Sequence, residues 1–202
     1  MQSTMEVYIA VEGDLDEIVV TKVLTKIGIK VKISYGKKGK DFIMVNLNKY
    51  NYAAKHSTIP WLLLVDLDND ADCAPPFVKE KLPLPATNMI FRVAVRKIES
   101  WLLSDREAIA SFLEIPMEKV PTLCDALRDP KAQLINLARK SRSRKIIEDM
   151  VPRPDSGSKQ GPLYTYRMKY FAEQFWRPEI ASKNSDSLNR FIKALRKAAQ
   201  KP

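Results

Sequence analysis

The residues best suited to chemistry are acidic and occur in two short clusters. Glu12 and Asp16 follow the apolar run "EVYIAV", and the aspartates of "WLLLVDLDND" begin with Asp66 and Asp68. Carboxylates held within a few ångströms of one another repel, and their pKa values rise unless a cation is present. Oxygen ligands without histidine favour Mg²⁺ or Mn²⁺, which also accept phosphate oxygens. We therefore expect a divalent metal ion at these acids; the competing interpretation is that they cap helices and form turns.

Both clusters lie at the ends of predicted strands. Over roughly the first half of the chain, short β-branched runs alternate with amphipathic stretches, which is typical of βα units on a parallel sheet. The expected strands are 6–13, 30–34, 61–66 and 89–95, and the expected helices between them are 14–28 and 41–57. Ligands bind beyond the carboxyl ends of such strands. Because Glu12 ends the first strand and Asp66 the third, we expect their side chains at one edge of the sheet.

Helical periodicity replaces the strand pattern from Arg96 onward. Helices are expected at 96–113, 130–141, 142–151, 163–178 and 185–200, and a Pro-, Gly- and Ser-rich loop at 152–162. The expected fold class is therefore α/β, with a doubly wound, mostly parallel, four-stranded sheet in domain 1–105 and a helical C-terminal region at 106–202. The aromatic residues of that region are mostly at helical spacing and are interpreted as core: Tyr164, Tyr166, Tyr170, Phe171, Phe175 and Trp176.

Composition narrows the classes of protein to consider. The chain has 202 residues, of which 45% are hydrophobic, enough for a packed core. Its only histidine is His56 and its two cysteines are far apart, which argues against a His-rich zinc hydrolase and a disulfide scaffold. No apolar run reaches the roughly 18 residues that span a bilayer, and no signal-peptide pattern is present, so we expect a cytoplasmic protein. The net charge of +10 favours a polyanionic partner such as DNA or RNA.

The acidic motifs resemble those of a known family. "VEGDLD" after the first strand and "DLDND" after the third are similar to the TOPRIM domain, which topoisomerases, bacterial primases, recombination proteins and OLD-type nucleases share. That family carries a Glu-Gly pair and an Asp-x-Asp, which match Glu12, Gly13, Asp66 and Asp68. The spacing of Glu12 and Asp16 resembles the OLD-type nucleases, although their distal lysine and second metal cluster are not matched. "RVAVRKIESWLLSD" adds a likeness to small standalone TOPRIM proteins of bacterial phage-defence loci, which are often encoded beside an ATPase.

The resemblance implies a nuclease site. Glu12, Asp66 and Asp68 would bind Mg²⁺ or Mn²⁺, and Asp16 would help to hold a second ion or orient the attacking water. Glu99, just past the fourth strand, would assist them; alternatively, it only stabilises the N-terminus of its helix. Arg96 and Lys97 would stabilise the charge that develops on a cleaved phosphate.

Basic residues form two further groups. Lys37, Lys38 and Lys40 belong to "GKKGK", which we expect to be a flexible loop at the same edge as the acids, where it would hold a phosphate. The denser group "ARKSRSRK" would bind a nucleic-acid backbone through Arg139, Arg142, Arg144 and Lys145. The competing interpretation of this denser group is a solvated surface.

The function that these residues favour is a metal-dependent nuclease in a bacterial or phage-defence context. The alternative is a TOPRIM effector or sensor module that is non-catalytic or is activated by a partner ATPase; the small chain and the unmatched distal lysine favour it. A third reading is a nucleotidyl or phosphoryl transferase, or a phosphatase of the haloacid dehalogenase type, because "DLDND" also begins with Asp-x-Asp. That family places its nucleophilic aspartate after the first strand, where this chain has Glu12.

Overall fold

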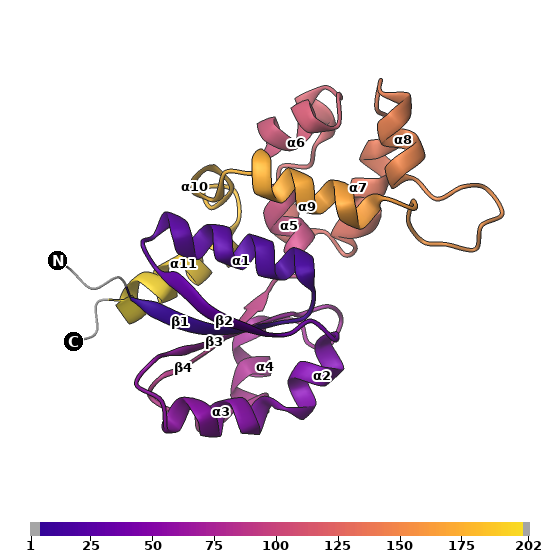
Figure 1. Cartoon of the computed structure of the whole chain (residues 1–202). Helices are drawn as coiled ribbons and strands as arrows, with labels where there is room; N and C mark the ends of the chain where they lie inside the picture. Colours follow the sequence, from indigo (N-terminus) through magenta and orange to yellow (C-terminus); the bar gives the residue numbers. More distant parts are fainter. Residues whose placement is uncertain (1–4, 200–202) are drawn as a thin grey trace. The chain divides into compact units, whose positions relative to one another are not determined.

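Four parallel strands form the sheet that carries the candidate site (Figure 1). They are β1 (Glu6–Val11), β2 (Lys30–Gly36), β3 (Trp61–Asp66) and β4 (Met89–Ala94), in the order β2-β1-β3-β4. Strand β1 pairs with β2 and β3, and β3 pairs with β4, always in parallel. The expected α/β class and the positions of all four strands are thereby confirmed.

Strand β3 is the most deeply buried of the four. Every side chain from Trp61 to Val65 is buried, and β3 has a strand on either side. A continuous apolar run without polar alternation predicts this interior position.

The computed structural model describes residues 5–199, which fall into two compact units. Of the described residues, unit 1 contains 5–95 and 189–199, and unit 2 consists of Arg96–Leu188. The boundary thus follows β4 directly, where the strand pattern ends, whereas the domain expected from the sequence extends to 105 and the C-terminal segment is expected in the helical region. Among the described residues, no helix has the length and apolar character needed to cross a membrane.

Helices cover both faces of the sheet in unit 1. Helix α1 (Asp14–Lys26) lies on one side, and α2 (Lys40–Val45), α3 (Leu47–Lys55) and α4 (Ala74–Lys81) lie on the other (Figure 1). The last helix, α11 (Asp186–Ala199), belongs to unit 1 from Asn189 onward. Beyond the end of α1, Gly28 has φ +76°, the left-handed conformation that the sequence predicts there.

Two local features of these helices differ from the expectation. The single helix expected over 41–57 is interrupted at Asn46, whose Nδ2 donates to the carbonyl of Phe42. Asparagine competes for backbone groups in this way, so an unbroken helix was the wrong prediction. Helix α4 was not predicted; it has proline in its first turn, where the missing N–H is tolerated.

The sheet and the helices of unit 1 enclose a contiguous apolar core. Its buried members include Leu63 and Val65 from β3, Phe91 from β4, Ile43 from α2 and Phe77 from α4. Burial of such side chains stabilises the fold by about 1.5–3 kcal/mol each, which fixes the strand ends that carry the acids.

Unit 2 is helical, and its described residues contain no strand. Its helices are α5 (Ile98–Leu103), α6 (Arg106–Phe112), α7 (Pro130–Ala138), α8 (Arg144–Met150), α9 (Tyr164–Gln174) and α10 (Pro178–Ala181), with 3₁₀ turns at Met117–Lys119 and Cys124–Ala126. The interpretation of its aromatic residues as core is confirmed for three of them, Tyr164, Phe171 and Trp176. It is wrong for the three that lie at the surface, namely Tyr166, Tyr170 and Phe175.

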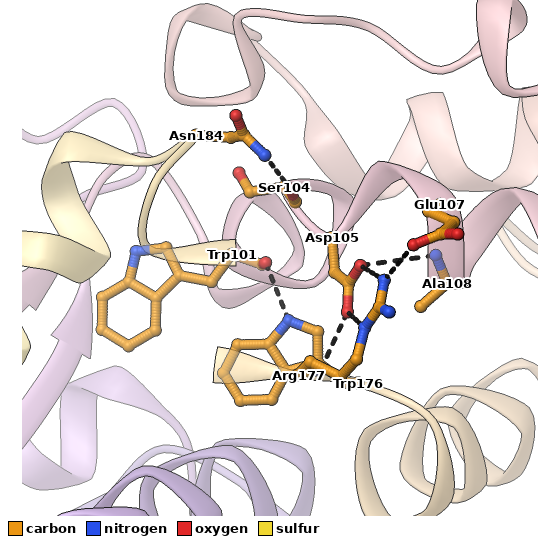
Figure 2. Close-up of polar contacts among 8 residues, drawn as sticks. All are labelled: Trp101, Ser104, Asp105, Glu107, Ala108, Trp176, Arg177 and Asn184. Atoms are coloured by element: carbon orange, nitrogen blue, oxygen red, sulfur yellow. Dashed lines mark hydrogen bonds and ion pairs between the residues drawn. The ribbon is translucent and has the colours of Figure 1, made fainter. Parts of the chain in front are cut away.

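A buried carboxylate, that of Asp105, organises unit 2 (Figure 2). It accepts hydrogen bonds from the main-chain N–H and the Nε of Arg177, both at 2.9 Å, and from the Nη2 of that arginine at 2.7 Å. It also accepts from the N–H of Ala108 and so caps α6. Beside it, the indole N–H of Trp176 donates to the carbonyl of Trp101 at 3.1 Å. These bonds fasten the segment before α10 to α5 and α6.

Candidate functional site

Glu12 and Asp66 meet at the carboxyl edge of the sheet. Glu12 directly follows β1, Asp66 ends β3, and these two strands are paired neighbours. The Oε1 of Glu12 accepts a hydrogen bond from the main-chain N–H of Asp66 at 2.7 Å. The glutamate side chain therefore extends across the sheet edge toward the end of β3.

Lys40 brings a positive charge into the same acidic segment. Its Nζ donates to the carbonyl oxygens of Asp66 and Leu67, the second at 3.3 Å. It also lies 3.2 Å from the Oδ2 of Asp68 and 2.6 Å from the Oδ2 of Asp70. The lysine side chain is only 15% exposed, so these four oxygens replace most of the water around its ammonium group.

The environment of Lys40 keeps its ammonium group charged. Burial lowers the pKa of Lys40, but hydrogen bonding to Asp70 and the charge of Asp68 raise it more, so its pKa lies above the ordinary value. The ring of Phe77, 5.4 Å from the Nζ, adds a cation–π contact. Lys40 is therefore a permanent cation at neutral pH.

The loop "GKKGK", expected to be flexible, is bonded through its main chain to the end of β1. The N–H of Lys37 donates to the carbonyl of Val11 at 2.8 Å, and the N–H of Gly39 donates to that of Glu12 at 2.9 Å. Gly36 has φ +89°, and a Cβ there would lie 2.4 Å from the Val11 carbonyl oxygen. Only glycine permits this approach, which sets the start of α2, and hence Lys40, beside Glu12.

The other two lysines of the loop do not join the acidic segment in the described contacts. Lys37 forms an ion pair of 3.1 Å with Glu17 on α1, and Lys38 lies over the ring of Phe42. Their expected role in binding phosphate stays a prediction.

Asp16 and Asp68 are placed by local backbone structure. Asp16 is buried in the first turn of α1, and its Oδ2 would lie 3.3 Å from a Cβ at Gly13. Its carboxylate thus faces the loop that follows β1. Asp68 has a left-handed φ of 53°, a conformation that aspartate tolerates better than most residues.

The remaining predicted site residues belong to unit 2. Glu99 is buried in α5 and accepts a hydrogen bond of 3.4 Å from the hydroxyl of Tyr164. Burial raises the pKa of the Glu99 carboxyl, although the positive charges of Lys131 and Lys97 partly oppose this. Arg96, which precedes Lys97, is the first residue of unit 2.

The basic cluster of unit 2 lies at the surface. Its five members are all exposed and lie at the end of α7 and the start of α8: Arg139, Lys140, Arg142, Arg144 and Lys145. Within this cluster, Arg139 donates to Asn136 and Arg144 pairs with Glu148, both at 2.8 Å. Five cations without an acid between them in the sequence are accessible to a phosphate backbone.

The oxygen atoms of Asp66–Asp70 are of the kind that binds a hard metal cation, but in this structure they surround the ammonium group of Lys40. Carboxylate and carbonyl oxygens are the ligands that Mg²⁺ and Mn²⁺ prefer. Across residues 5–199, however, no three acidic, histidine or cysteine side chains are grouped as a metal site would require. A metal ion here would have to compete with the ammonium group of Lys40.

The fold and the site together define an α/β protein with a lysine-containing acidic cluster at the carboxyl edge of a parallel sheet. Comparison with known proteins adds no family, because the chain matches no protein-family model, no curated protein and no solved structure.

Sequence reasoning missed the partnership of Lys40 with Asp70. Asp70 lies two residues beyond the Asp-x-Asp pair, and the resemblance assigns it no role. The signal was present in the strand pattern, since "GKKGK" and "DLDND" both follow strands of one parallel sheet. Opposite charges in such loops are brought to the same edge.

Proposed function

We propose that the protein is a metal-dependent phosphodiesterase that cleaves nucleic acid. The observation that carries this proposal is the ammonium group of Lys40 among four oxygens of Asp66–Asp70, next to Glu12. A set of oxygens that already surrounds a cation is chemically suited to a hard metal ion. The likeness of "VEGDLD" and "DLDND" to the TOPRIM motifs supports the same assignment, with a TOPRIM-like, doubly wound domain in a bacterial or phage-defence context.

Each residue of the site has a proposed role. Glu12, Asp66 and Asp68 would hold Mg²⁺ or Mn²⁺, with Asp16 as a further acid. The metal ion would supply an activated water and neutralise charge on the phosphate. A phosphate that enters beside these acids meets the ammonium group of Lys40, which donates hydrogen bonds to its oxygens.

Residues of unit 2 complete the proposal. The basic cluster binds the nucleic-acid backbone without regard to sequence, because phosphate contacts carry no base information. For Glu99, Arg96 and Lys97, which belong to unit 2, the assisting roles that the resemblance implies stay predictions.

The direct experiment is cleavage of plasmid, single-stranded DNA and RNA in Mg²⁺ or Mn²⁺. We expect the wild-type chain to cleave at least one of them, and Asp66→Ala and Glu12→Gln to lose that activity. Glu80→Gln, which neutralises an exposed glutamate of α4, is the matched control and should cleave like the wild type. Equal cleavage by the wild type and both site variants would rule out this site.

Nucleic-acid binding is tested separately through its dependence on salt. Alanine at Arg139, Arg142, Arg144 and Lys145 should weaken binding to all sequences alike and reduce the slope of log K against log salt by about one per lost contact. The control variant carries alanine at four other lysines, Lys49, Lys55, Lys79 and Lys159, and loses the same amount of charge. An unchanged slope in the cluster variant means that the cluster is only a solvated surface.

A second candidate is the partner-activated module, and the same lysine favours it. Lys40 neutralises the acids in the chain as it stands, so a metal would bind weakly until a partner ATPase moves the lysine. This version predicts that the isolated chain is inert, and that an ATPase co-purifying from native lysate restores cleavage. Cleavage by the isolated chain, abolished in Asp66→Ala, would decide for the first candidate.

A further inference from the structure

A groove of about 800 Å³ runs along the outer edge of β4 in unit 1. The consecutive residues Asn88–Arg92 all line it. Side chains of a strand alternate between the two faces, so a cleft over one face would contact only every second residue. Contact with five in succession shows that the groove follows the backbone edge. Strand β4 is the last in the order β2-β1-β3-β4, so this edge carries no further strand.

The hydrogen-bonding groups of β4 point into this groove at alternate residues. The carbonyl of Asn88 accepts from Trp61 of β3, and that of Ala94 accepts from Leu67 just beyond β3. Because the pattern repeats every second residue, Ile90 and Arg92 also direct their main-chain groups toward β3. The N–H and carbonyl of Phe91 therefore face outward, and no described residue forms a hydrogen bond with them.

Two helices form walls beside this edge. Val78 and Leu82 line the groove from α4 and its end, and Ala194, Lys197 and Ala198 line it from α11. The alanines leave space between helix and strand. The groove also reaches Glu6 and Pro60, near the amino ends of β1 and β3. It is therefore distinct from the acidic site at the carboxyl ends.

The charged side chains of the groove that could pair with a ligand are positive. Glu6 is held by Lys32 at 3.0 Å, whereas Arg92 forms no hydrogen bond or ion pair with a described residue. The Arg92 side chain is exposed, so its charge is accessible to an anionic partner, although partial desolvation lowers its pKa. Lys197 adds a second cation from α11.

We propose that this groove binds an acidic, extended segment of a partner protein, which adds to the sheet as a strand beside β4. The N–H of Met89 is already bonded to Ala86, so the carbonyl of Met89 and the N–H and carbonyl of Phe91 are the main-chain groups, two residues apart, that match the backbone of a peptide. The cations match its acidic side chains. A nucleic acid has no such alternation of donors and acceptors. A second copy of this chain would bring another +10 charge against Arg92 and Lys197, which disfavours self-association. The proposal is independent of the nuclease activity proposed above.

The experiment uses fluorescein-labelled peptides and the full chain. We expect an alternating glutamate–valine peptide to bind about tenfold more tightly than its lysine–valine counterpart. Arg92→Glu with Lys197→Glu should reverse this preference, while Lys49→Glu with Lys55→Glu should not. Ala198→Trp, which fills the groove without a change of charge, should abolish binding. In amide exchange measured by NMR, bound peptide should protect the N–H of Phe91, whereas that of Ile90 should be unchanged.

Several results would overturn the proposal. Absence of saturable peptide binding would do so, as would displacement of the peptide by a single-stranded oligonucleotide. Glutamate–valine peptides with N-methyl groups at alternate residues test backbone pairing, and undiminished binding in both registers would contradict it. Protection of Phe91 that depends on protein concentration alone would identify a second copy as the occupant. If the wild type binds no peptide and Arg92→Ala aggregates, then Arg92 serves only to prevent edge-to-edge association of β4.

Discussion

The ammonium group of Lys40 lies 2.6 Å from a carboxylate oxygen of Asp70. The two residues follow β2 and β3, strands that are not neighbours because β1 lies between them. Between them, Glu12 follows β1, and its main-chain carbonyl accepts a hydrogen bond from Gly39, the residue before Lys40. One contact thus joins the segments that follow β2 and β3 and places a cation at the acidic edge.

Replacement of Lys40 by methionine should have opposite effects on metal binding and on cleavage. Without the ammonium group the acids repel one another, so Mn²⁺ affinity should rise about tenfold, or roughly 1.4 kcal/mol. Cleavage should fall at least about 100-fold, since a phosphate ligand is lost. Calorimetric titration with Mn²⁺ and a plasmid cleavage assay measure the two effects. Lys55→Met, on the exposed surface of α3, is the control, and unchanged Mn²⁺ affinity in Lys40→Met would contradict the account.

Gly36→Ala should destabilise the protein and displace the loop that carries Lys40. The new Cβ would lie 2.4 Å from the Val11 carbonyl oxygen at a φ of +89°, so strain and steric overlap add to about 3–5 kcal/mol. Gly39→Ala is a matched control, because its φ is +85° but its Cβ would have no neighbour within 4 Å. Its loss should be about 1–3 kcal/mol, because φ +85° with ψ 171° is a conformation that only glycine normally adopts. Urea unfolding measures both, and equal losses would show that the approach to Val11 is not restrictive.

The sequence predicts the strands of unit 1 better than it predicts the contacts within the acidic site. Apolar runs such as "WLLLVD" are interpretable because a strand buried on both faces cannot alternate. The position of the acidic loops at one edge of the sheet is also predictable, because the carboxyl ends of parallel strands lie at the same edge. Which loop residues contact one another across that edge depends on backbone details, such as the left-handed φ of Asp68, that periodicity does not reveal.

In unit 2, helical periodicity predicts the helices but not which of their aromatic residues are buried. Helical spacing identified α9, yet it did not separate buried Tyr164 and Phe171 from exposed Tyr166. A short helix with aromatic residues around its circumference has no unique buried face in the sequence alone. Which side of α9 is buried depends on the segments that pack around it. One such packing contact is the hydrogen bond from Trp176 to Trp101.

Asp105→Ala should destabilise unit 2 much more than Glu107→Ala, although both acids pair with Arg177. The Asp105 carboxylate is fully buried and accepts bonds from Arg177 and Ala108, so its loss should lower the free energy of unfolding by about 2–4 kcal/mol. The Glu107 side chain is 74% exposed, and its ion pair of 2.8 Å should contribute about 0–1 kcal/mol. Urea unfolding followed by tryptophan fluorescence measures the difference. Equal losses would contradict the assignment of Asp105 as the organising acid.

Glu99→Gln should change how stability depends on pH. Burial raises the pKa of Glu99, so the folded protein binds this proton more tightly than the unfolded chain, in which the pKa is near 4.5. The contribution of Glu99 to stability is therefore greatest below that pH and declines as pH rises toward the folded pKa. Glutamine keeps an oxygen for the Tyr164 hydroxyl but cannot ionise, so the variant should lose this decline and be more stable at neutral pH.

Unfolding measured between about pH 4 and pH 8 tests this prediction. Glu118→Gln, at an exposed position in the first 3₁₀ turn, should keep the wild-type profile. Identical profiles for Glu99→Gln and the wild type would mean that Glu99 is not shifted by burial. Loss of cleavage in Glu99→Gln, together with increased stability, would support its proposed role in the reaction.

The most direct test of the central claim is the anomalous electron density of a crystal grown with Mn²⁺. The account predicts one Mn²⁺ peak at the carboxyl edge, about 2.0–2.3 Å from carboxylate oxygens of Glu12, Asp66 and Asp68, with the ammonium group of Lys40 moved away from Asp68 and Asp70. A crystal saturated with Mn²⁺ that shows no peak there, with Lys40 still bonded to Asp70, would contradict it.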